Sequence, residues 1–161
     1  MNRSDVYEAL WCPAIQNEET IERLSLALRR IESAVVPEHH GPGQESGCTW
    51  SFFVDAKGNG LGPGPGAWPH DAVRLCQVAF SYRGPFLTAL SWNDPRFMPE
   101  APTDPLLVTQ VKQIGLTLNL EYLDAWQLLA WEIPWDELKG DASMRLDSSE
   151  MPNAFNLLFY E

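Results

Sequence analysis

A glycine-rich stretch near the middle of the chain is the first place where phosphate chemistry could reside. Gly58 and Gly60 match the first two glycines of the dinucleotide-binding pattern G-x-G-x-x-G, but Pro63 occupies the third position. The stretch also lacks the Gly-Lys-Ser/Thr ending of a Walker loop. Pro63 and Pro65 have no backbone N–H to offer a phosphate. The sequence therefore favours a long surface loop here over a nucleotide site.

Two patterns contain metal-ligand residue types, and neither has the required spacing. Asp55 begins a stretch with some features of a calcium loop, but Lys57 occupies position 3, which needs an oxygen ligand. Position 12, which needs a glutamate, is Gly66. The zinc candidates, whose spacing matches no zinc motif, are His39, His40, His70, Cys48 and Cys76. We therefore expect neither a metal site nor a cofactor.

Nucleophilic catalysis has little support from the sequence. Cys48 and Cys76 fall in or beside predicted strands, where a thiol usually acts as a small, inert hydrophobic group. The G-x-S-x-G turn of serine hydrolases is absent. An enzyme would therefore need a site assembled from residues that lie apart along the chain. The candidates for such a site are His70, Asp71, Trp92, Asp94 and Asp136.

The strongest candidate is an aromatic and acidic segment from Asp124 to Glu137. Protein interfaces favour tryptophan as an anchor, and acidic groups around it speed encounter with a basic partner. The alternative is that the tryptophans belong to the core and the acids to a solvated face. Adjacent acids after a proline also suit the first turn of a short helix. The predicted partner-binding residues are Asp124, Trp126, Trp131, Glu132, Trp135, Asp136 and Glu137.

The elements that must position these residues predict an α+β fold. Residues 18–35 form an amphipathic helix in this prediction, because apolar residues recur there every three or four positions. Asn17 is its expected N-cap, and Pro37 is expected to end it. Residues 37–47 have the composition of a loop. Three antiparallel strands, the last two forming a hairpin beside the first, are predicted over 49–54, 73–82 and 86–92.

The C-terminal half is predicted to contain one or two helices and a closing strand, which brings the sheet to about four strands. Asp104-Pro105 starts a helix well, with a capping carboxylate followed by proline at the first helical position. Gly115 leaves two continuations open: the helix passes through it, or it ends the helix and a strand follows. Residues 122–133 are predicted to be helical. Residues 153–160 are predicted to be the closing strand.

The size and charge of the chain limit its domain organisation and its partners. A chain of 161 residues has the size of one domain, and no linker separates two cores, so residues 1–161 are expected to form a single domain. The net charge is −11, of which residues 113–161 carry −7. Phosphate backbones and anionic membranes repel such a surface, so we expect no nucleic-acid and no membrane partner.

These observations predict a binding protein rather than an enzyme. No apolar run suggests a signal peptide, so the expected compartment is the cytoplasm. The favoured hypothesis is a small acidic immunity-type protein that neutralises a basic partner such as a bacterial toxin. The alternatives are a small-ligand-binding protein or hydrolase with the dispersed site that includes His70, and a structural subunit of an assembly.

Overall fold

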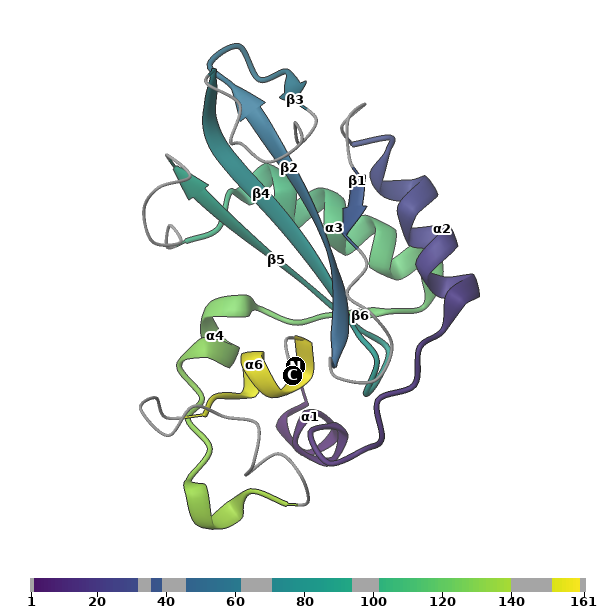
Figure 1. Cartoon of the computed structure of the whole chain (residues 1–161), viewed down its shortest axis with the longest axis vertical. Coiled ribbons are helices and arrows are strands. Elements are labelled where there is room, and N and C mark those ends of the chain that lie inside the picture. The colour runs from purple at the N-terminus through teal and green to yellow at the C-terminus, as the bar shows by residue number, and fades with distance from the viewer. Residues whose placement is uncertain are drawn as a thin grey trace.

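The fold is α+β, as the sequence predicted, with two groups of helices on the sheet (Figure 1). The sheet is mixed and has more strands than the predicted antiparallel sheet of about four. The computed structural model describes residues 2–31, 46–61, 71–93, 102–139 and 152–159, and the backbone of 36–38. The strands are β1 (Val36–Glu38), β2 (Gly47–Asp55), β3 (Gly60–Leu61), β4 (Ala72–Ser81), β5 (Phe86–Asn93) and β6 (Glu121–Tyr122). The helices are α1 (Arg3–Ala9), α2 (Glu18–Leu28), α3 (Pro105–Leu118), α4 (Ala125–Leu129), the short 3₁₀ helix η1 (Trp135–Glu137) and α6 (Ala154–Phe159).

The sheet has the strand order β1-β2-β4-β5-β6, with β3 paired to β2. The predicted hairpin beside the first strand is confirmed, because β4 pairs antiparallel with both β2 and β5. The β5–β6 pair is parallel. Parallel neighbours need a crossover connection, and α3 supplies it. The sheet is therefore mixed, with one parallel pair at its β6 edge.

Helices α2 and α3 cover one face of the sheet (Figure 1). The predicted alternation is confirmed here, since Trp50, Phe52 and Val54 of β2 all enter this core. The indole N–H of Trp50 donates a hydrogen bond to Ser25 Oγ of α2 at 3.0 Å. Because Trp50 is fully buried, this bond satisfies a donor that would otherwise destabilise the core. It also fixes α2 against the sheet.

The N-terminus of α2 is as predicted, and its C-terminus is not. The Asn17 side chain accepts a hydrogen bond from the Thr20 N–H at 3.0 Å, which confirms it as the N-cap. The helix ends at Leu28, before the predicted end at residue 35. The Arg29 N–H still bonds four residues back, whereas those of Arg30 and Ile31 bond three residues back, to the carbonyls of Ala27 and Leu28. This tightening is a common way to satisfy the last carbonyls of a helix.

Gly115 lies inside α3, so the helical continuation of this segment is the correct one. The chain returns over this residue, and the Leu120 N–H donates to the Gly115 carbonyl at 2.8 Å. A Cβ at position 115 would lie only 2.9 Å from the Leu120 carbonyl oxygen, so the close approach needs glycine. The left-handed C-cap is instead Asn119, with φ 55°. Asparagine tolerates this conformation better than most residues.

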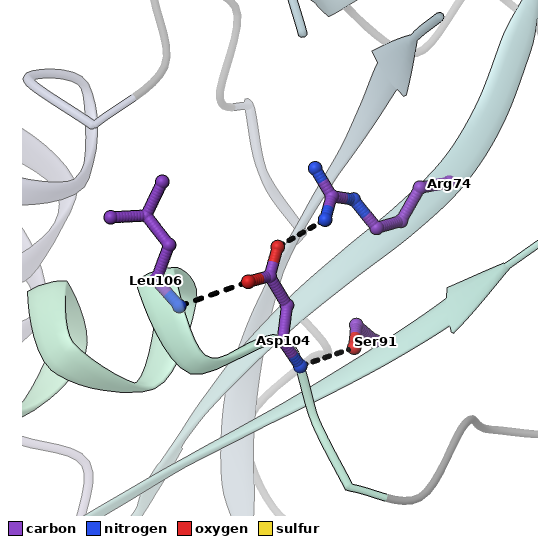
Figure 2. Close-up of polar contacts among 4 residues, drawn as sticks. All are labelled: Arg74, Ser91, Asp104 and Leu106. Atoms are coloured by element: carbon purple, nitrogen blue, oxygen red, sulfur yellow. Dashed lines mark hydrogen bonds and ion pairs between the residues drawn. The ribbon is translucent and has the colours of Figure 1, made fainter.

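Asp104 anchors the start of α3 to the sheet, as Figure 2 shows. Its carboxylate accepts a hydrogen bond from the Leu106 N–H at 2.9 Å, which confirms the predicted cap. The same carboxylate pairs with the Arg74 guanidinium of β4. Its backbone N–H donates to Ser91 Oγ of β5 at 2.9 Å. One residue thus joins the helix to two strands.

The predicted closing strand is wrong, because residues 154–159 form helix α6. The prediction rested on the alternation of Phe155, Leu157 and Phe159, but Ala154 and Leu158 are buried as well. Burial on all sides suits a short helix enclosed by other elements better than a half-buried strand. The Asn153 side chain accepts from the Asn156 N–H at 2.9 Å and so supports the first turn.

Two other predictions need correction. Of the predicted helix over 122–133, only the residues of α4 are helical. Ile133 instead donates its N–H to the Pro152 carbonyl at 2.8 Å, in an extended segment. The predicted loop over 37–47 is wrong at both ends, where Pro37 lies in β1 and Gly47 in β2. Proline is tolerated in β1 because β1 is an edge strand.

Helices α1, α4 and α6 form a second core against the opposite face of the sheet. α1 and α6 contribute to the same core although they come from distant parts of the chain. Val6 of α1 and Leu157 of α6 are both almost completely buried in this core. In the part of the chain that the structure covers, no helix has the length and apolarity needed to span a bilayer.

Candidate binding face

Three aromatic side chains meet where α1 approaches the segment that follows α4. The rings of Tyr7 and Trp11 are 5.8 Å apart, edge to face. The rings of Tyr7 and Trp131 are stacked at 6.3 Å. Both are favourable arrangements for aromatic pairs. All three side chains are partly exposed, and we call them the aromatic cluster.

The local sequence explains this arrangement. Asn2 caps α1 by accepting a hydrogen bond from the Ser4 N–H, and Val6 then fixes the buried side of the helix. Tyr7 and Trp11 are four residues apart, so they lie on the same side of this turn. Trp131 follows α4, whose own buried residue Leu128 belongs to the same core as Val6. Packing of the two segments in one core therefore brings their aromatic rings together.

Two cationic side chains of this chain lie over the aromatic cluster. The Arg3 guanidinium carbon is 4.7 Å from the centre of the Trp131 ring. The Lys139 ammonium nitrogen is 5.5 Å from the Trp11 ring and 6.0 Å from the Tyr7 ring. A cation within about 6 Å of an aromatic face is attracted by the negative charge density there. The cluster is thus a surface that attracts cations.

A carboxylate borders the aromatic cluster. Tyr7 donates its hydroxyl proton to Glu137 Oε2 at 3.2 Å. Desolvation raises the pKa of Tyr7, and this bond to Glu137 raises it further. Glu137 belongs to η1 with Trp135 and Asp136, all of them exposed. We call the aromatic cluster and these three residues the binding face.

The structure places the seven predicted residues in different roles. Trp131 and Glu137 enter or border the aromatic cluster, and Trp135 and Asp136 share η1 with Glu137. Trp135 is 37% exposed. It is the most exposed tryptophan among those whose side chains the structure describes. Trp131 and Glu137 thus come together at the aromatic cluster, and Trp135 and Asp136 directly precede Glu137 in the chain.

The other three predicted residues take part in local structure. Asp124 is the N-cap of α4 and accepts a hydrogen bond from the Gln127 N–H at 2.9 Å. Trp126 is partly buried, and its indole N–H donates to Thr103 Oγ1 at 3.2 Å. Glu132 is exposed and forms a β-bridge with Asn153. The side chains of Asp124 and Trp126 thus support local structure, whereas the bridge of Glu132 involves its backbone.

Sequence reasoning missed the contribution of α1. The sequence predicts no helix before residue 18, and therefore no role for Arg3, Tyr7 or Trp11. It predicts none for Lys139 either. A signal was present in the Asn2 cap and in the four-residue spacing of Tyr7 and Trp11. That signal predicts a short helix with an aromatic side. It does not predict the segment against which this side packs.

The alternative dispersed site is not assembled among the described residues. Asp71 and Trp92 lie near one end of the β4–β5 pair, whereas the segment with Asp136 lies at the opposite end of the molecule (Figure 1). His70 and Asp94 lie outside the described residues, as do the zinc candidates His39 and His40.

The two buried cysteines do not resemble catalytic thiols or metal ligands. Cys48 and Cys76 are 1% and 2% exposed in the core beneath α2 and α3. Desolvation raises the pKa of Cys48 to about 12, so its thiol stays protonated at neutral pH. Within the described ranges, no group of three histidine, cysteine, aspartate or glutamate residues could hold a metal ion.

A shallow groove lies between α2 and α3. Its volume is about 270 Å³, and apolar residues such as Ile31, Ile114 and Leu118 line it together with Arg30. Pockets for small ligands usually measure about 300–1,000 Å³ and enclose most of the ligand. The groove is smaller than that, so it does not favour a small-ligand function.

No protein-family model matches the chain, and neither a curated protein nor a solved structure does. Arguments about function therefore depend on the geometry of the chain itself.

Proposed function

We propose that this protein is a non-enzymatic binding module that captures a basic protein in the cytoplasm, as an immunity protein neutralises a cationic toxin. One observation carries the proposal: the aromatic cluster already holds cationic side chains, Arg3 over Trp131 and Lys139 over Trp11. The exposed carboxylate of Glu137 lies beside these rings, and exposed Asp136 precedes it in η1. Such a surface has the chemistry to bind the cations of a partner.

The charge of the chain supports the same function. The net charge is −11, and residues 113–161, which include η1, carry −7 of it. A negative surface raises the local concentration of a cationic partner and can speed association by about 10-fold or more at low salt. Trp135 offers an anchor that a partner could bury, and interface tryptophans often contribute about 2 kcal/mol or more.

The cysteines support a reducing compartment. Cys12 is exposed and Cys48 and Cys76 are buried, and no disulfide joins them. In oxidising compartments, cysteines in small domains are commonly joined in disulfides. Free thiols are the usual state in the cytoplasm.

The direct test is capture of the partner followed by measurement of its binding rate. A tagged copy of the protein would be recovered from its own cells, with the neighbouring genes expressed, and the retained proteins identified by mass spectrometry. We expect a protein of high isoelectric point. With that protein purified, the double variant Asp136→Lys/Glu137→Lys should associate about 10-fold more slowly at low salt, with a weaker dependence on salt.

The matched control reverses the charge of the other two adjacent acidic residues, in the variant Glu18→Lys/Glu19→Lys. These residues are exposed at the start of α2. Each double variant replaces two acids by two lysines, so the change in total charge is the same. Circular dichroism would confirm that both variants are folded. Equal slowing by both variants would show that total charge, and not the binding face, governs association. Retention of no basic protein would contradict the proposed function.

A further inference from the structure

The two cations on the aromatic cluster are held at different distances. Arg3 lies 4.7 Å from the Trp131 ring, well within the range of a cation–π contact. Lys139 lies 5.5 Å from the Trp11 ring and 6.0 Å from the Tyr7 ring, near the outer limit of about 6 Å. Lys139 is therefore the more loosely held of the two.

Lys139 also has little else to hold it. Its side chain is exposed, and within the described part of the chain its contacts are these two rings, with no hydrogen bond or ion pair. Glu137, two residues earlier, directs its carboxylate to the Tyr7 hydroxyl. The two rings and this carboxylate would remain in place if the ammonium group moved away.

We propose that the Tyr7 and Trp11 rings, with Glu137 beside them, form a site for a lysine or arginine side chain of a basic protein, and that Lys139 occupies this site until the partner arrives. This inference rests on the proposed function and adds the chemistry of recognition. The rings attract the arriving cation, and Glu137 adds an opposite charge at the edge. Lys139 then acts as an internal competitor that lowers the apparent affinity.

Removal of the competitor should therefore strengthen binding. The probe is a decalysine peptide at fixed ionic strength, titrated into the whole protein and followed by isothermal calorimetry. Lys139→Gln should bind the peptide about two- to fivefold more tightly than the wild type, which corresponds to the usual strength of an exposed cation–π contact.

The matched control is Lys112→Gln. Lys112 also lies over a ring of this chain, 5.2 Å from the Tyr122 ring, but Tyr122 packs against the other core. The two variants remove the same charge and the same kind of contact. Lys112→Gln should therefore change the affinity by less than about twofold.

A second measurement locates the peptide on the protein. The indole N–H signals of the tryptophans can be followed by NMR during the titration. The Trp11 signal should shift, whereas the signal of Trp50, which is fully buried under α2, should not. Trp11→Leu should weaken binding. Tyr7→Phe, which keeps a ring but loses the bond to Glu137, should weaken it less.

Three results would overturn the inference: equal effects of Lys139→Gln and Lys112→Gln, weaker binding by Lys139→Gln, or no detectable binding of decalysine to any variant. None of them would decide the proposed function, which depends on capture of a basic protein and on the η1 variants. Conversely, failure to capture a basic protein would contradict that function even if decalysine bound at Tyr7 and Trp11.

Discussion

Asp55 holds the turn after β2 through hydrogen bonds that favour its charged form. Its carboxylate accepts from the backbone N–H groups of Lys57 and Asn59, both at 2.8 Å, and from the Asn59 side chain at 2.9 Å. These bonds, with the Asn59 side chain contributing most, lower the pKa of Asp55 below its usual value. The turn also needs Gly58, whose φ of 83° lies in the left-handed region.

The lowered pKa of Asp55 predicts a pH-dependent contribution to stability. A carboxyl group with a folded-state pKa below its unfolded value of about 3.9 stabilises the fold above that value. This contribution disappears as the pH falls through the folded-state pKa. Asp55→Asn should therefore be less stable than the wild type at pH 6 to 7, and the difference should shrink below about pH 4.

Urea-unfolding midpoints measured at several pH values would test this prediction. Asp71→Asn is the control, because Asp71 is an exposed carboxylate outside the turn. A difference between wild type and Asp55→Asn that stayed constant with pH would show that the charge of Asp55 is not the stabilising factor.

At the scale of the elements, the start of α3 depends on two separate interactions of Asp104. Its carboxylate caps the helix at the Leu106 N–H and pairs with Arg74 (Figure 2). Asparagine also caps helices well, so Asp104→Asn should lose only the ion pair, about 0.5–1 kcal/mol of the free energy of unfolding. Asp104→Ala should lose about 1–2 kcal/mol more, because the cap is lost too.

Thermal or urea unfolding of both variants would measure these losses. Asp124 supplies the comparison, because it caps α4 through Gln127 and no ion pair of the described residues involves it. Asp124→Asn should therefore be nearly neutral, and Asp124→Ala should lose about 1 kcal/mol. If Asp104→Asn were as destabilising as Asp104→Ala, the ion pair and not the cap would hold the start of α3.

The elements that could be predicted are those with a strong local signal. The caps at Asn17 and Asp104 and the alternation of Trp50, Phe52 and Val54 all depend on neighbours in the sequence, and all are confirmed. Helix α6 could not be recognised from its pattern, because its surroundings bury nearly every residue and so erase the polar side.

The same reasoning applies to the binding face. The segment from Asp124 to Glu137 stood out because its aromatic and acidic residues lie close together in the sequence. Its contact with Tyr7 depends instead on how α1 packs across more than a hundred intervening residues. No local pattern encodes such a contact. The sequence therefore predicted one side of the face and missed the other.

At the scale of the whole molecule, the three cysteines divide into one accessible and two protected thiols. Cys12 is exposed, whereas Cys48 and Cys76 are buried in the core of the sheet. Burial also raises the pKa of Cys48 to about 12, which removes the reactive thiolate. A chromogenic aromatic disulfide at pH 8 should therefore label one thiol of the native protein rapidly, and three thiols in urea.

The slow labelling of the other two thiols would report on opening of the fold. The rate of this labelling should rise as the free energy of unfolding falls. A destabilised variant such as Asp104→Ala should therefore react faster. Cys12→Ser is the control, because it should abolish the rapid phase only. Rapid labelling of two thiols in Cys12→Ser would contradict the burial of Cys48 and Cys76.

The core that α1 shares with α4 and α6 also determines when the aromatic cluster can form during synthesis. α1 leaves the ribosome first, but its core neighbours Leu128 and Leu157 are translated more than a hundred residues later. At roughly 5–20 residues per second, α1 waits on the order of ten seconds for them. A helix of 7 residues is unstable alone, so Tyr7 and Trp11 gain a fixed position only afterwards. A nascent chain would thus lack the finished aromatic cluster, and on the proposed function it could not yet bind the partner.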